Sequence, residues 1–400
     1  MKILFLTLAR IDSIEDRGIY PDLLRKFRNE GHSIVILCPS ERKFNKKTQL
    51  ITEHGTRILK VWTTNIQKTN VIEKLISTLL IEFFFLKAIN KYVKDENFDL
   101  ILYSTPPITF TKLISKIKTK FSSRTYLLLK DIFPQNAVDL NMFSKRSLIY
   151  KYFRRKEEIL YQISDHIGCM SEFNRKYLLA NNSFLTNEKV EVNPNTIFLL
   201  PEKEQFELSR EILALLPKDK VIFVYGGNLG KPQGVDFLLD IINGMRTDTK
   251  VFFVIVGSGT ESQRIQKWFN KNKPHNALVI NHLPQTEYDV LLGCCHVGLV
   301  FLNPNFTIPN YPSRILSYME NKLPILFGID DNTDVGREAE LGNYGLSCKN
   351  GDLTTFTKYI DLLSNDNELR EKMGQNGYNR LKEDFNVDYS YNMIIKKCNS

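Results

Sequence analysis

The stretch Val224–Gly234, VYGGNLGKPQG, has residue types that can bind anionic ligands. It continues the apolar run Val221–Phe223, so the pattern predicts a short buried strand that ends in a glycine-rich loop. Glycines let a ligand approach the backbone closely, exposed amides can bind anionic oxygens, and Lys231 adds a positive charge. The loop matches neither the P-loop pattern nor the GxGxxG dinucleotide fingerprint, so a plain glycine turn with a solvated lysine stays open as the alternative.

Two later stretches repeat this arrangement. Val254–Ile265, VIVGSGTESQRI, reads as a strand, a glycine-rich turn and a polar helix start. Pro309–Leu326, PNYPSRILSYMENKLPIL, reads as a loop, a helix that begins near Pro312-Ser313 and a further strand. Arg314 falls in the first turn of that helix, where a guanidinium could reach a phosphate. The three stretches together favour a phosphate-binding site over an ordinary turn.

Strands and helices alternate along the whole chain, which predicts parallel sheets covered by helices on both faces. In the first half we expect a helix at Pro21–Asn29, a helix capped by Ser171, and the strands Ile3–Leu8, His32–Cys38, Arg57–Trp62, Phe98–Tyr103, Thr125–Leu129 and Asp165–Met170. In the second half we expect the strands Val221–Tyr225, Val251–Val256, Leu278–Ile280, Val297–Phe301 and Pro324–Phe327. Between the two series, the charged stretch Glu202–Arg210 is expected to be a linker.

This pattern predicts an α/β protein with two doubly wound, Rossmann-like domains that face a cleft. A chain of 400 residues is long enough for two such cores. We expect the domains at residues 1–195 and 196–375, followed by a C-terminal helix, 376–400, that packs back on the first domain. Ligands of open α/β sheets bind beyond the carboxyl ends of the strands, so the ligand is expected in the cleft.

The positive charge is concentrated in the first half. Residues 1–200 carry 32 Lys and Arg against 20 Asp and Glu, whereas residues 201–400 carry 22 against 25. A basic domain is expected to meet an anionic surface, either nucleic acid or an anionic membrane leaflet. No apolar stretch reaches the roughly 20 residues of a membrane span, and the N-terminal apolar run is too short for a signal peptide. The six cysteines lack disulfide or zinc spacing, which indicates reduced thiols in a cytosolic compartment.

Four motifs occur in the order and spacing of a known family: VYGGNLGKPQGVD, VGSGTE, NYPSRILSYMENKLPIL and GDLTTFTKYIDLLSND. With the opening RGIYPDLLRKFRNEGHSIVIL, the chain resembles the family 4 glycosyltransferases of the GT-B fold over almost its whole length. Leu127–Leu140, LLLKDIFPQNAVDL, brings the resemblance closest to transferases of bacterial O-antigen and capsule synthesis, including amino-deoxysugar transferases. The resemblance implies a nucleotide-sugar donor held mainly by the second domain and an acceptor held by the first.

The resemblance also implies which residues bind the donor. The loop near the diphosphate is matched by Asn228, Gly230 and Lys231, the region near the nucleotide by Gly257 and Glu261, and the helix start beside the phosphates by Pro312, Ser313 and Arg314. Gly18 matches a first-domain loop that closes over the donor. His282, which follows an expected strand, could border the base.

Two features depart from the family pattern. A Glu-x7-Glu motif, whose second carboxylate binds the ribose, is replaced here by Pro309 and Ser317, and a second basic residue after the lysine is replaced by Gln233. The Ser317 hydroxyl can still hydrogen-bond a ribose hydroxyl, although more weakly than a carboxylate does. UDP as the nucleotide therefore rests on the resemblance alone.

Glycosyl transfer needs stabilisation of the leaving diphosphate, and Lys231 and Arg314 could neutralise the charge that develops there. No DxD metal motif occurs, and the resemblance implies a retaining enzyme that needs no metal and no cofactor. Asp131, at the end of a first-domain strand, is the candidate acid, base or acceptor ligand, with Glu157 or Glu158 as weaker candidates. The alternative for Asp131 is a turn-capping role before Pro134.

The segment Val71–Val93 has apolar residues at helical spacing, and Ile81 and Phe85 widen the stripe beyond one core face. This width and the basic clusters of the first half predict that a lipid-linked acceptor docks where the first domain meets an anionic membrane. The clusters are Lys112, Lys116, Lys118, Lys120 and Arg124, followed by Lys145, Arg146, Lys151, Arg154, Arg155 and Lys156. The expected location is cytoplasmic and peripheral, on the inner face of the cell membrane. A helix that only packs on the sheet is the alternative.

The predicted function is transfer of a hexosyl or N-acetylaminosugar group from a nucleotide-sugar to a lipid-linked saccharide. A nucleotide-sugar epimerase on the same fold is the main alternative, but it would need more acid–base side chains in the cleft than this chain offers. A nucleic-acid-binding or scaffold protein is the third candidate. The basic clusters lack the interleaved aromatic residues of a nucleic-acid binder, so we expect no nucleic-acid partner.

Overall fold

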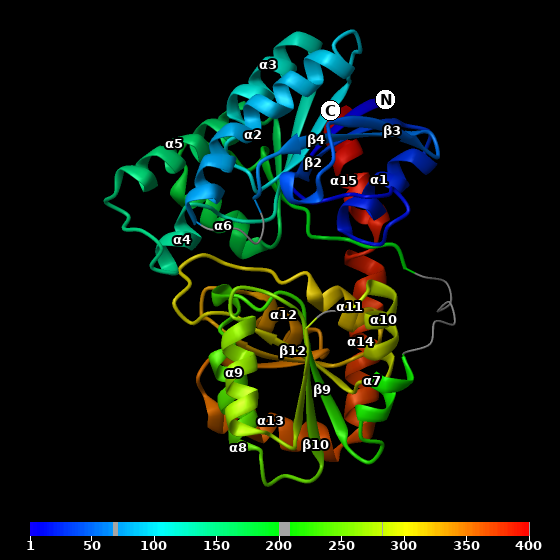
Figure 1. Cartoon of the computed structure of the whole chain (residues 1–400), viewed down its shortest axis with the longest axis vertical. Helices are drawn as coiled ribbons and strands as arrows, with labels where there is room; N and C mark the ends of the chain where they lie inside the picture. The colour runs from blue at the N-terminus through cyan, green and yellow to red at the C-terminus, as the bar shows by residue number, and fades with distance from the viewer. Residues whose placement is uncertain (67–70, 200–208, 282, 400) are drawn as a thin grey trace. The chain divides into compact units, whose positions relative to one another are not determined.

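The computed structural model describes residues 1–66, 71–199, 209–281 and 283–399 of the chain (Figure 1). It divides into two compact units, Met1–Phe198 with Val387–Ser400 as the first and Leu199–Asn386 as the second. These divisions lie slightly beyond residues 195 and 375, because the last helix of the second unit continues to Asp384. Most of the linker expected at Glu202–Arg210 lies outside the described residues.

The described residues of the first unit form an eight-stranded sheet with the order β3-β4-β2-β1-β5-β6-β7-β8. The strands are β1 (Lys2–Leu6), β2 (Ser33–Glu41), β3 (Gln49–Glu53), β4 (Thr56–Thr63), β5 (Leu100–Ser104), β6 (Arg124–Leu129), β7 (His166–Cys169) and β8 (Val190–Val192). Every neighbouring pair is parallel except β3 and β4, which are antiparallel. The sequence pattern did not predict β3, because this edge strand is half-exposed and lacks an apolar run.

Helices cover both faces of this sheet. One face packs against α2 (Val71–Tyr92), α3 (Thr111–Phe121), α5 (Leu148–Ile163) and α6 (Glu172–Asn181). The other face packs against α1 (Ile19–Asn29) and α15 (Val387–Asn399). Alternate residues of β1 point to opposite faces of the sheet. Leu4 and Leu6 pack in the core under α2, α3, α5 and α6, whereas Ile3 and Phe5 pack in the core under α1 and α15. Ser171 caps α6 by accepting a hydrogen bond from the amide of Asn174, as the sequence predicts.

The C-terminal helix α15 packs against α1. The Tyr391 ring lies edge-on to Phe27 with 4.9 Å between centroids, and its hydroxyl is 3.1 Å from Nε2 of His32. Lys26 of α1 forms an ion pair with Asp388 at 2.6 Å. The first unit is therefore built from both ends of the chain, as the blue and red segments of Figure 1 show.

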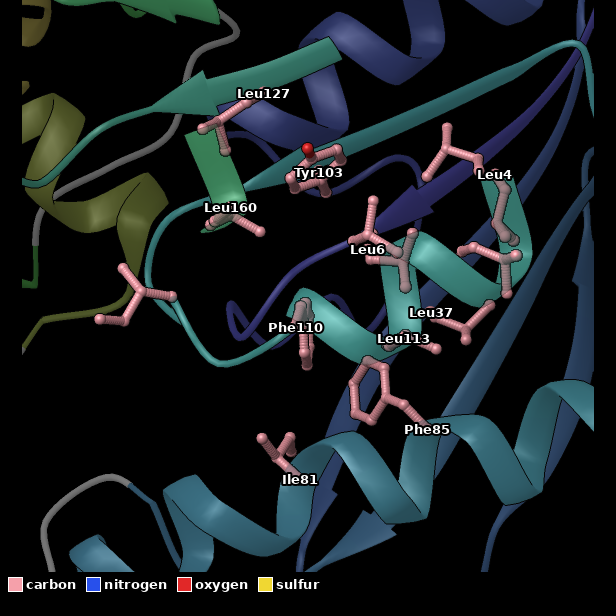
Figure 2. Packing of buried hydrophobic residues seen from close by; sticks show 14 of the residues in the cluster. Leu4, Leu6, Leu37, Ile81, Phe85, Tyr103, Phe110, Leu113, Leu127 and Leu160 are labelled. Atoms are coloured by element: carbon pink, nitrogen blue, oxygen red, sulfur yellow. The ribbon is translucent and has the colours of Figure 1, made fainter. Parts of the chain in front are cut away.

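The structure contradicts one part of the prediction for α2. Ile81 and Phe85, expected to face a membrane, are fully buried in the first core, where the Phe85 ring lies 5.1 Å from the Phe110 ring (Figure 2). The exposed apolar side chains of α2 are instead Ile76, Leu79, Leu80 and Phe83. The stripe is indeed wider than one core face, but periodicity alone does not tell which edge of the stripe the sheet covers.

The described residues of the second unit form a six-stranded parallel sheet with the order β11-β10-β9-β12-β13-β14. The strands are β9 (Val221–Gly226), β10 (Val251–Val256), β11 (Ala277–Ile280), β12 (Val297–Phe301), β13 (Ile325–Ile329) and β14 (Gly345–Lys349). The sequence predicted all of them except β14, whose residues are only partly buried. The parallel, doubly wound α/β class is confirmed in both units.

The helices of the second unit are α7 (Arg210–Leu215), α8 (Asp236–Gly244), α9 (Ser262–Asn272), α10 (Gln285–Gly293), α11 (Arg314–Glu320), α12 (Val335–Leu341), α13 (Leu353–Asn365) and α14 (Asn367–Asp384). One sheet face packs against α8, α9 and α13 around Phe237 and Phe356. On the other side, Tyr318 of α11 lies directly under Gly298 of β12. The α11 helix also contacts α10 and α14.

We predict opposite outcomes for two neighbouring phenylalanines of α2. Phe85→Ala should lower the free energy of unfolding of the first unit by about 3–5 kcal/mol, because it leaves a cavity in the core. Phe83→Ala should change it by less than about 0.5 kcal/mol, because that side chain is 61% exposed. Urea denaturation followed by the fluorescence of Trp62, in a Trp268→Phe background, measures both changes. Equal effects of the two substitutions would contradict the orientation of α2.

Candidate functional site

The glycine-rich loop that opened the sequence analysis lies at the carboxyl end of β9, which pairs with β10 on one side and β12 on the other. The connections after β9 and β12 run to opposite sides of the sheet, and such a switch point is where open α/β sheets bind ligands. The loop is ordered by Gln233, whose Oε1 accepts from Nδ2 of Asn228 at 3.0 Å and from the amide of Gly230 at 3.2 Å. The residue that replaces the second basic residue of the family pattern therefore shapes the loop.

The loops after β9 and β10 touch at glycines. The amide of Gly227 donates to the carbonyl of Val256 at 2.9 Å, and the amide of Leu229 donates to the carbonyl of Ser258 at 3.0 Å. A Cβ atom at Gly257 would lie 1.8 Å from the carbonyl oxygen of Gly227, and Gly257 has a φ of +153°. Only glycine fits at this contact. Two of the stretches singled out in the sequence thus form one surface.

Arg314 brings the third stretch to the same place. Its guanidinium lies over the ring of the buried Tyr225, with 4.3 Å between Cζ and the ring centroid. A Cβ atom at Gly227 would be 3.4 Å from the Arg314 guanidinium carbon, so the cation lies beside the glycine loop. Among the described residues no carboxylate pairs with it, and its Nη1 atom is buried without a hydrogen-bond partner. This is a positive charge that the protein itself does not neutralise.

Tyr318 fixes α11, the helix that carries Arg314, to the end of β9. Its hydroxyl accepts from the amide of Gly226 at 3.0 Å and lies 3.2 Å from the carbonyl oxygens of Val224 and Leu299. Burial raises the pKa of Tyr318 to about 12, so the hydroxyl stays protonated at neutral pH and can donate as well as accept. Sequence reasoning missed this tyrosine, because nothing in the residue pattern shows that it packs under Gly298.

Lys231 lies in the same loop, in the single turn Lys231–Gln233, and is exposed. Its carbonyl accepts from Nδ2 of Asn303 at 3.1 Å, and Pro232 accepts from the amide of Asn303 at 2.9 Å, which ties this loop to the one after β12. No ion pair of Lys231 is found within the described ranges. Its ammonium group therefore remains available to an anionic ligand.

The remaining residues expected in the donor site have the following surroundings. Glu261 forms an ion pair with Arg264 at 2.6 Å, and Arg264 also pairs with Asp236. Ser313 is the N-cap residue of α11, next to Pro312, and its side chain makes no capping hydrogen bond. Ser317 is half-buried in the second turn of α11. His282 lies outside the described residues.

In the first unit, Gly18 precedes α1 and its amide donates to Oδ1 of Asp22 at 3.2 Å. Asp22 is fully buried, also pairs with Arg25, and accepts from the amide of Phe198 through Oδ2 at 2.9 Å. Burial raises the pKa of Asp22, and the hydrogen bonds from Phe198 and Gly18 oppose that shift. Asp22 thus fixes the loop of Gly18 and the end of the first segment to one point, a role that the sequence did not reveal.

Asp131 directly follows β6. Both of its carboxylate oxygens accept from Nδ2 of Asn136 in α4 (Gln135–Asp139), at 2.8 and 3.0 Å. Thr105 accepts from the amides of Lys130 and Asp131 at 3.0 and 3.3 Å, which fixes the backbone of this turn. The carboxylate is therefore held in one orientation. These contacts suit both a ligand-binding role and the turn-forming alternative.

The other carboxylates considered for this role lie on α5. Glu157 is buried and bonds Arg154 and the hydroxyl of Tyr161, the latter at 2.8 Å, while burial raises the pKa of Glu157 to about 6. Glu158 pairs with Arg155 at 3.5 Å. Both contacts stabilise the helix itself. The described part of the chain contains no group of three or more His, Cys, Asp or Glu side chains that could hold a metal ion.

Comparison with known proteins identifies the second unit. The family model described as glycosyl transferases group 1 matches residues 206–380. This match to a glycosyltransferase group 1 domain spans most of the second unit, Leu199–Asn386. All three stretches around the glycine loop fall inside this group 1 domain, and the family resemblance read from the motifs is confirmed.

Two curated relatives resemble the chain over different lengths. A probable glycosyltransferase, WbjE, of Pseudomonas aeruginosa is 24% identical over 270 residues, which are 66% of this chain and 65% of the relative. The putative colanic acid biosynthesis glycosyl transferase WcaI of Escherichia coli K12 is 31% identical over 87 residues, 20% of each chain. The chain thus matches less than two thirds of the length of either relative.

Solved structures cover the chain almost completely. Sucrose-phosphate synthase from Thermosynechococcus elongatus superposes with a TM-score of 0.73 at 14% identity, covering 99% of this chain and 98% of the other. The Escherichia coli trehalose-6-phosphate structure with UDP-2-fluoro glucose bound gives a TM-score of 0.76 at 11% identity and the same coverage. These enzymes have the GT-B fold, so the fold implied by the sequence resemblance is confirmed for this chain.

The glycine contact between the two loops predicts a large effect of one methyl group. Gly257→Ala should lower the free energy of unfolding of the group 1 domain by about 2 kcal/mol or more, because the carbonyl of Gly227 cannot move away without breaking the loop. Gly244→Ala is the matched control, since its Cβ would meet Leu353 at a comfortable 3.7 Å. The fluorescence of Trp268 during urea denaturation, in a Trp62→Phe background, reports on this unit. A stable Gly257→Ala variant would show that the loops are not in contact.

Proposed function

We propose that this protein is a glycosyltransferase that moves a sugar from a UDP-linked nucleotide-sugar to a lipid-linked saccharide in bacterial surface polysaccharide synthesis. The observation that carries the proposal is the cation of Arg314 at the carboxyl end of β9, beside Gly227 and without an acidic partner in the described part of the chain. A diphosphate supplies the missing negative charge. The name of the colanic acid relative and the group 1 domain support the same reaction class.

The proposed chemistry at the donor is electrostatic. When the sugar leaves, negative charge grows on the diphosphate, and donors that already point at this position stabilise it without reorganising. Arg314 and Lys231 supply these donors, and Gly230 is assigned to the loop that carries Lys231. We assign Asn228, Gly257, Pro312 and Ser313 to the walls of the same site, and Glu261 and Ser317 to the nucleotide. With two cationic side chains at the diphosphate, the proposed reaction needs no metal ion, and we propose that it retains the anomeric configuration.

We place the acceptor in the first unit, with Asp131 as its ligand or as the group that takes the proton of the attacking hydroxyl. The two hydrogen bonds from Asn136 keep the carboxylate in one position at the end of β6, where a sugar hydroxyl would meet it in the same orientation each time. Gly18 is assigned to a loop that closes over the donor. Asp131 remains a proposal, because the same bonds would serve a structural turn.

The first unit also carries an apolar surface that suits a membrane. We call it the α2–α5 patch and define it by the exposed side chains Ile76, Leu79, Leu80 and Phe83 of α2 and Leu148, Ile149 and Tyr152 of α5. Both helices contact the first turn of α3: Glu82 accepts from the amide of Leu113 at 2.7 Å, and Lys156 donates to Thr111 at 3.0 Å. Because they meet the same turn, the two sets of apolar side chains belong to one surface.

Exposed cations accompany the α2–α5 patch. They are Lys112 and Lys116 on α3, and Lys145, Arg146, Lys151 and Arg155 in or just before α5. Of the described cations in the basic clusters, three are paired with acids: Lys118 with Asp165, Arg154 with Glu157, and the exposed Arg155 with Glu158. No helix in the described part of the chain is long and apolar enough to cross a membrane. We therefore propose that the first unit binds peripherally to the anionic inner face of the cell membrane, where its lipid-linked acceptor is found.

The proposed donor is tested by a thermal-shift screen of nucleotide-sugars with the full chain. A ligand present at 100 times its dissociation constant stabilises the folded state by about 2.7 kcal/mol. We expect a UDP-sugar to raise the melting temperature in wild type and to do so far less in Arg314→Met. Stabilisation of both proteins to the same extent, or of neither, would contradict the assignment of Arg314.

We predict that Lys231→Ala slows transfer from that donor by at least about 30-fold, or about 2 kcal/mol, because one charge at the leaving diphosphate is lost. Lys267→Ala on α9 is the control, since this lysine is also exposed. Arg314→Lys should restore only part of the activity lost in Arg314→Met, because an ammonium group lacks the rigid planar fork with which a guanidinium binds two phosphate oxygens side by side. Steady-state kinetics measure all four variants. Wild-type turnover in Lys231→Ala would remove this lysine from the site.

The proposed membrane binding is tested separately. Liposome sedimentation should recover the protein with anionic vesicles, and recovery should fall with added salt, because screening shortens the range of surface charges. Leu79→Ser with Phe83→Ser should weaken binding at least tenfold, since each buried apolar side chain contributes about 1.5–3 kcal/mol. Leu341→Ser with Leu362→Ser, two exposed leucines of the second unit, should change nothing. Recovery that is equal with neutral and anionic vesicles, or absent from both, would rule out the proposed membrane role.

A further inference from the structure

The turn after β6 places an unusual lysine next to Asp131. Thr105, which is 1% exposed and begins the loop after β5, accepts hydrogen bonds from the amides of both residues through its hydroxyl and so fixes the turn. The Lys130 side chain is only partly exposed. Its Nζ donates to the carbonyl oxygen of Asn193, just beyond β8, at 3.1 Å. The amine therefore lies at the carboxyl ends of the parallel strands, where sheets of this kind bind ligands.

This amine has no acidic partner. Among the residues that the structure describes, no carboxylate lies within ion-pairing distance of Nζ, and the carboxylate of Asp131 is turned towards Asn136. Few titratable groups face the amine. The Cys169 thiol of β7 influences the pKa of Lys130, and Glu172 and Arg175 of α6 influence the pKa of Cys169. Burial lowers the pKa of Lys130 to about 7, and the interaction with Cys169 opposes this shift. The amine therefore gives up its proton more readily than an ordinary lysine does.

A second feature of this edge also lacks a partner. The side-chain oxygens Oδ1 of Asn193, which is fully buried, and of Asn195, which is 8% exposed, accept no hydrogen bond from any described residue. Buried acceptors are nearly always satisfied by protein, water or ligand. Nδ2 of Asn193 donates to the hydroxyl oxygen of Tyr126 at 2.9 Å, which determines the orientation of this amide. Within the described residues, this edge thus combines an amine that has no anionic partner with two side-chain amide oxygens that accept no hydrogen bond.

We propose that Lys130 anchors an oxyanion site at the carboxyl end of β6, which takes a phosphoryl group of the acceptor lipid when the amine is protonated. The assignment of the phosphoryl group to the acceptor rests on the proposed function, whereas the oxyanion site itself does not. The hydroxyl groups of a phosphorylated saccharide are donors of the kind that Asn193 and Asn195 lack. Binding couples to a proton: the arriving anion raises the pKa of Lys130, and the neutral amine takes up a proton from solvent.

The oxyanion site is tested first with sulfate, whose charge does not change between pH 6 and 9. Calorimetry with the full chain should show affinity that is constant below pH 7 and falls by up to tenfold per pH unit above it, because only the ammonium form binds. Lys130→Arg should bind sulfate without this pH dependence, since a guanidinium stays charged. Lys130→Met should lose at least tenfold in affinity at pH 6.5. Lys91→Met, an exposed lysine near the end of α2 and outside both basic clusters, is the control and should match wild type.

The source of the phosphoryl group is decided by two further probes, farnesyl diphosphate for the acceptor lipid and UDP for the donor. We expect Lys130→Met to lower the affinity for farnesyl diphosphate at least tenfold and to leave the affinity for UDP unchanged. An equal loss for UDP would assign the site to the donor and overturn the acceptor role. Sulfate affinity that is the same in wild type and Lys130→Met, or that has the same pH profile in Lys130→Arg, would overturn the oxyanion site itself. If the sulfate and farnesyl diphosphate results both contradict the Lys130 site while wild type still binds UDP, the proposed glycosyltransferase function is unaffected.

Discussion

The candidate site of the second unit depends on one cation, Arg314, whose position is fixed by an aromatic ring, a glycine loop and its own helix, with no carboxylate beside it among the described residues. The guanidinium of Arg314 rests on the face of Tyr225, next to a glycine loop that leaves room for it, and the helix that carries it is pinned to the end of β9 through Tyr318. An unpaired charge away from bulk water is costly unless a partner arrives. The surrounding contacts fix the position of the cation, and the missing carboxylate leaves its charge for a ligand. The close approach of the loops at Gly227 and Gly257 serves the same end, because a side chain at either position would fill that space.

The first unit shows the same physical arrangement in a different form. Lys130 is also held at the end of a buried strand by backbone contacts and also lacks an acidic partner in the described residues. The two cations differ in their response to pH, because a guanidinium stays protonated whereas a desolvated amine loses its proton near neutrality. A donor site built on arginine would therefore keep its affinity over a wide pH range, and an acceptor site built on lysine would not. In the proposed reaction with two phosphorylated substrates, one of the two binding steps would therefore be sensitive to pH.

The α2 helix carries apolar side chains on its exposed side as well as on its buried side. Its buried residues, Ile81 and Phe85, form part of the core around Phe110, while Leu79 and Phe83 lie on the exposed side. A stripe that only packed on the sheet would need fewer apolar residues. The excess is accompanied by exposed lysines and arginines on α3 and α5, and the combination of apolar and cationic side chains matches the interface of an anionic leaflet.

The sequence by itself determined the fold class and singled out the stretches of the proposed donor site, because both follow from local patterns. Apolar runs of strand length, glycines directly after them and the order of four motifs do not depend on what lies far away in the chain. Only the tertiary structure decided which edge of α2 is buried, that Gln233 orders the glycine loop, and that Arg314 and Lys130 have no acidic partner among the residues it describes. These facts depend on contacts between residues far apart in the sequence, such as Tyr318 with Gly226 or Lys130 with Asn193. The half-exposed strands β3 and β14 escaped prediction for a related reason, since pairing with a neighbour stabilises them and their own residue pattern does not.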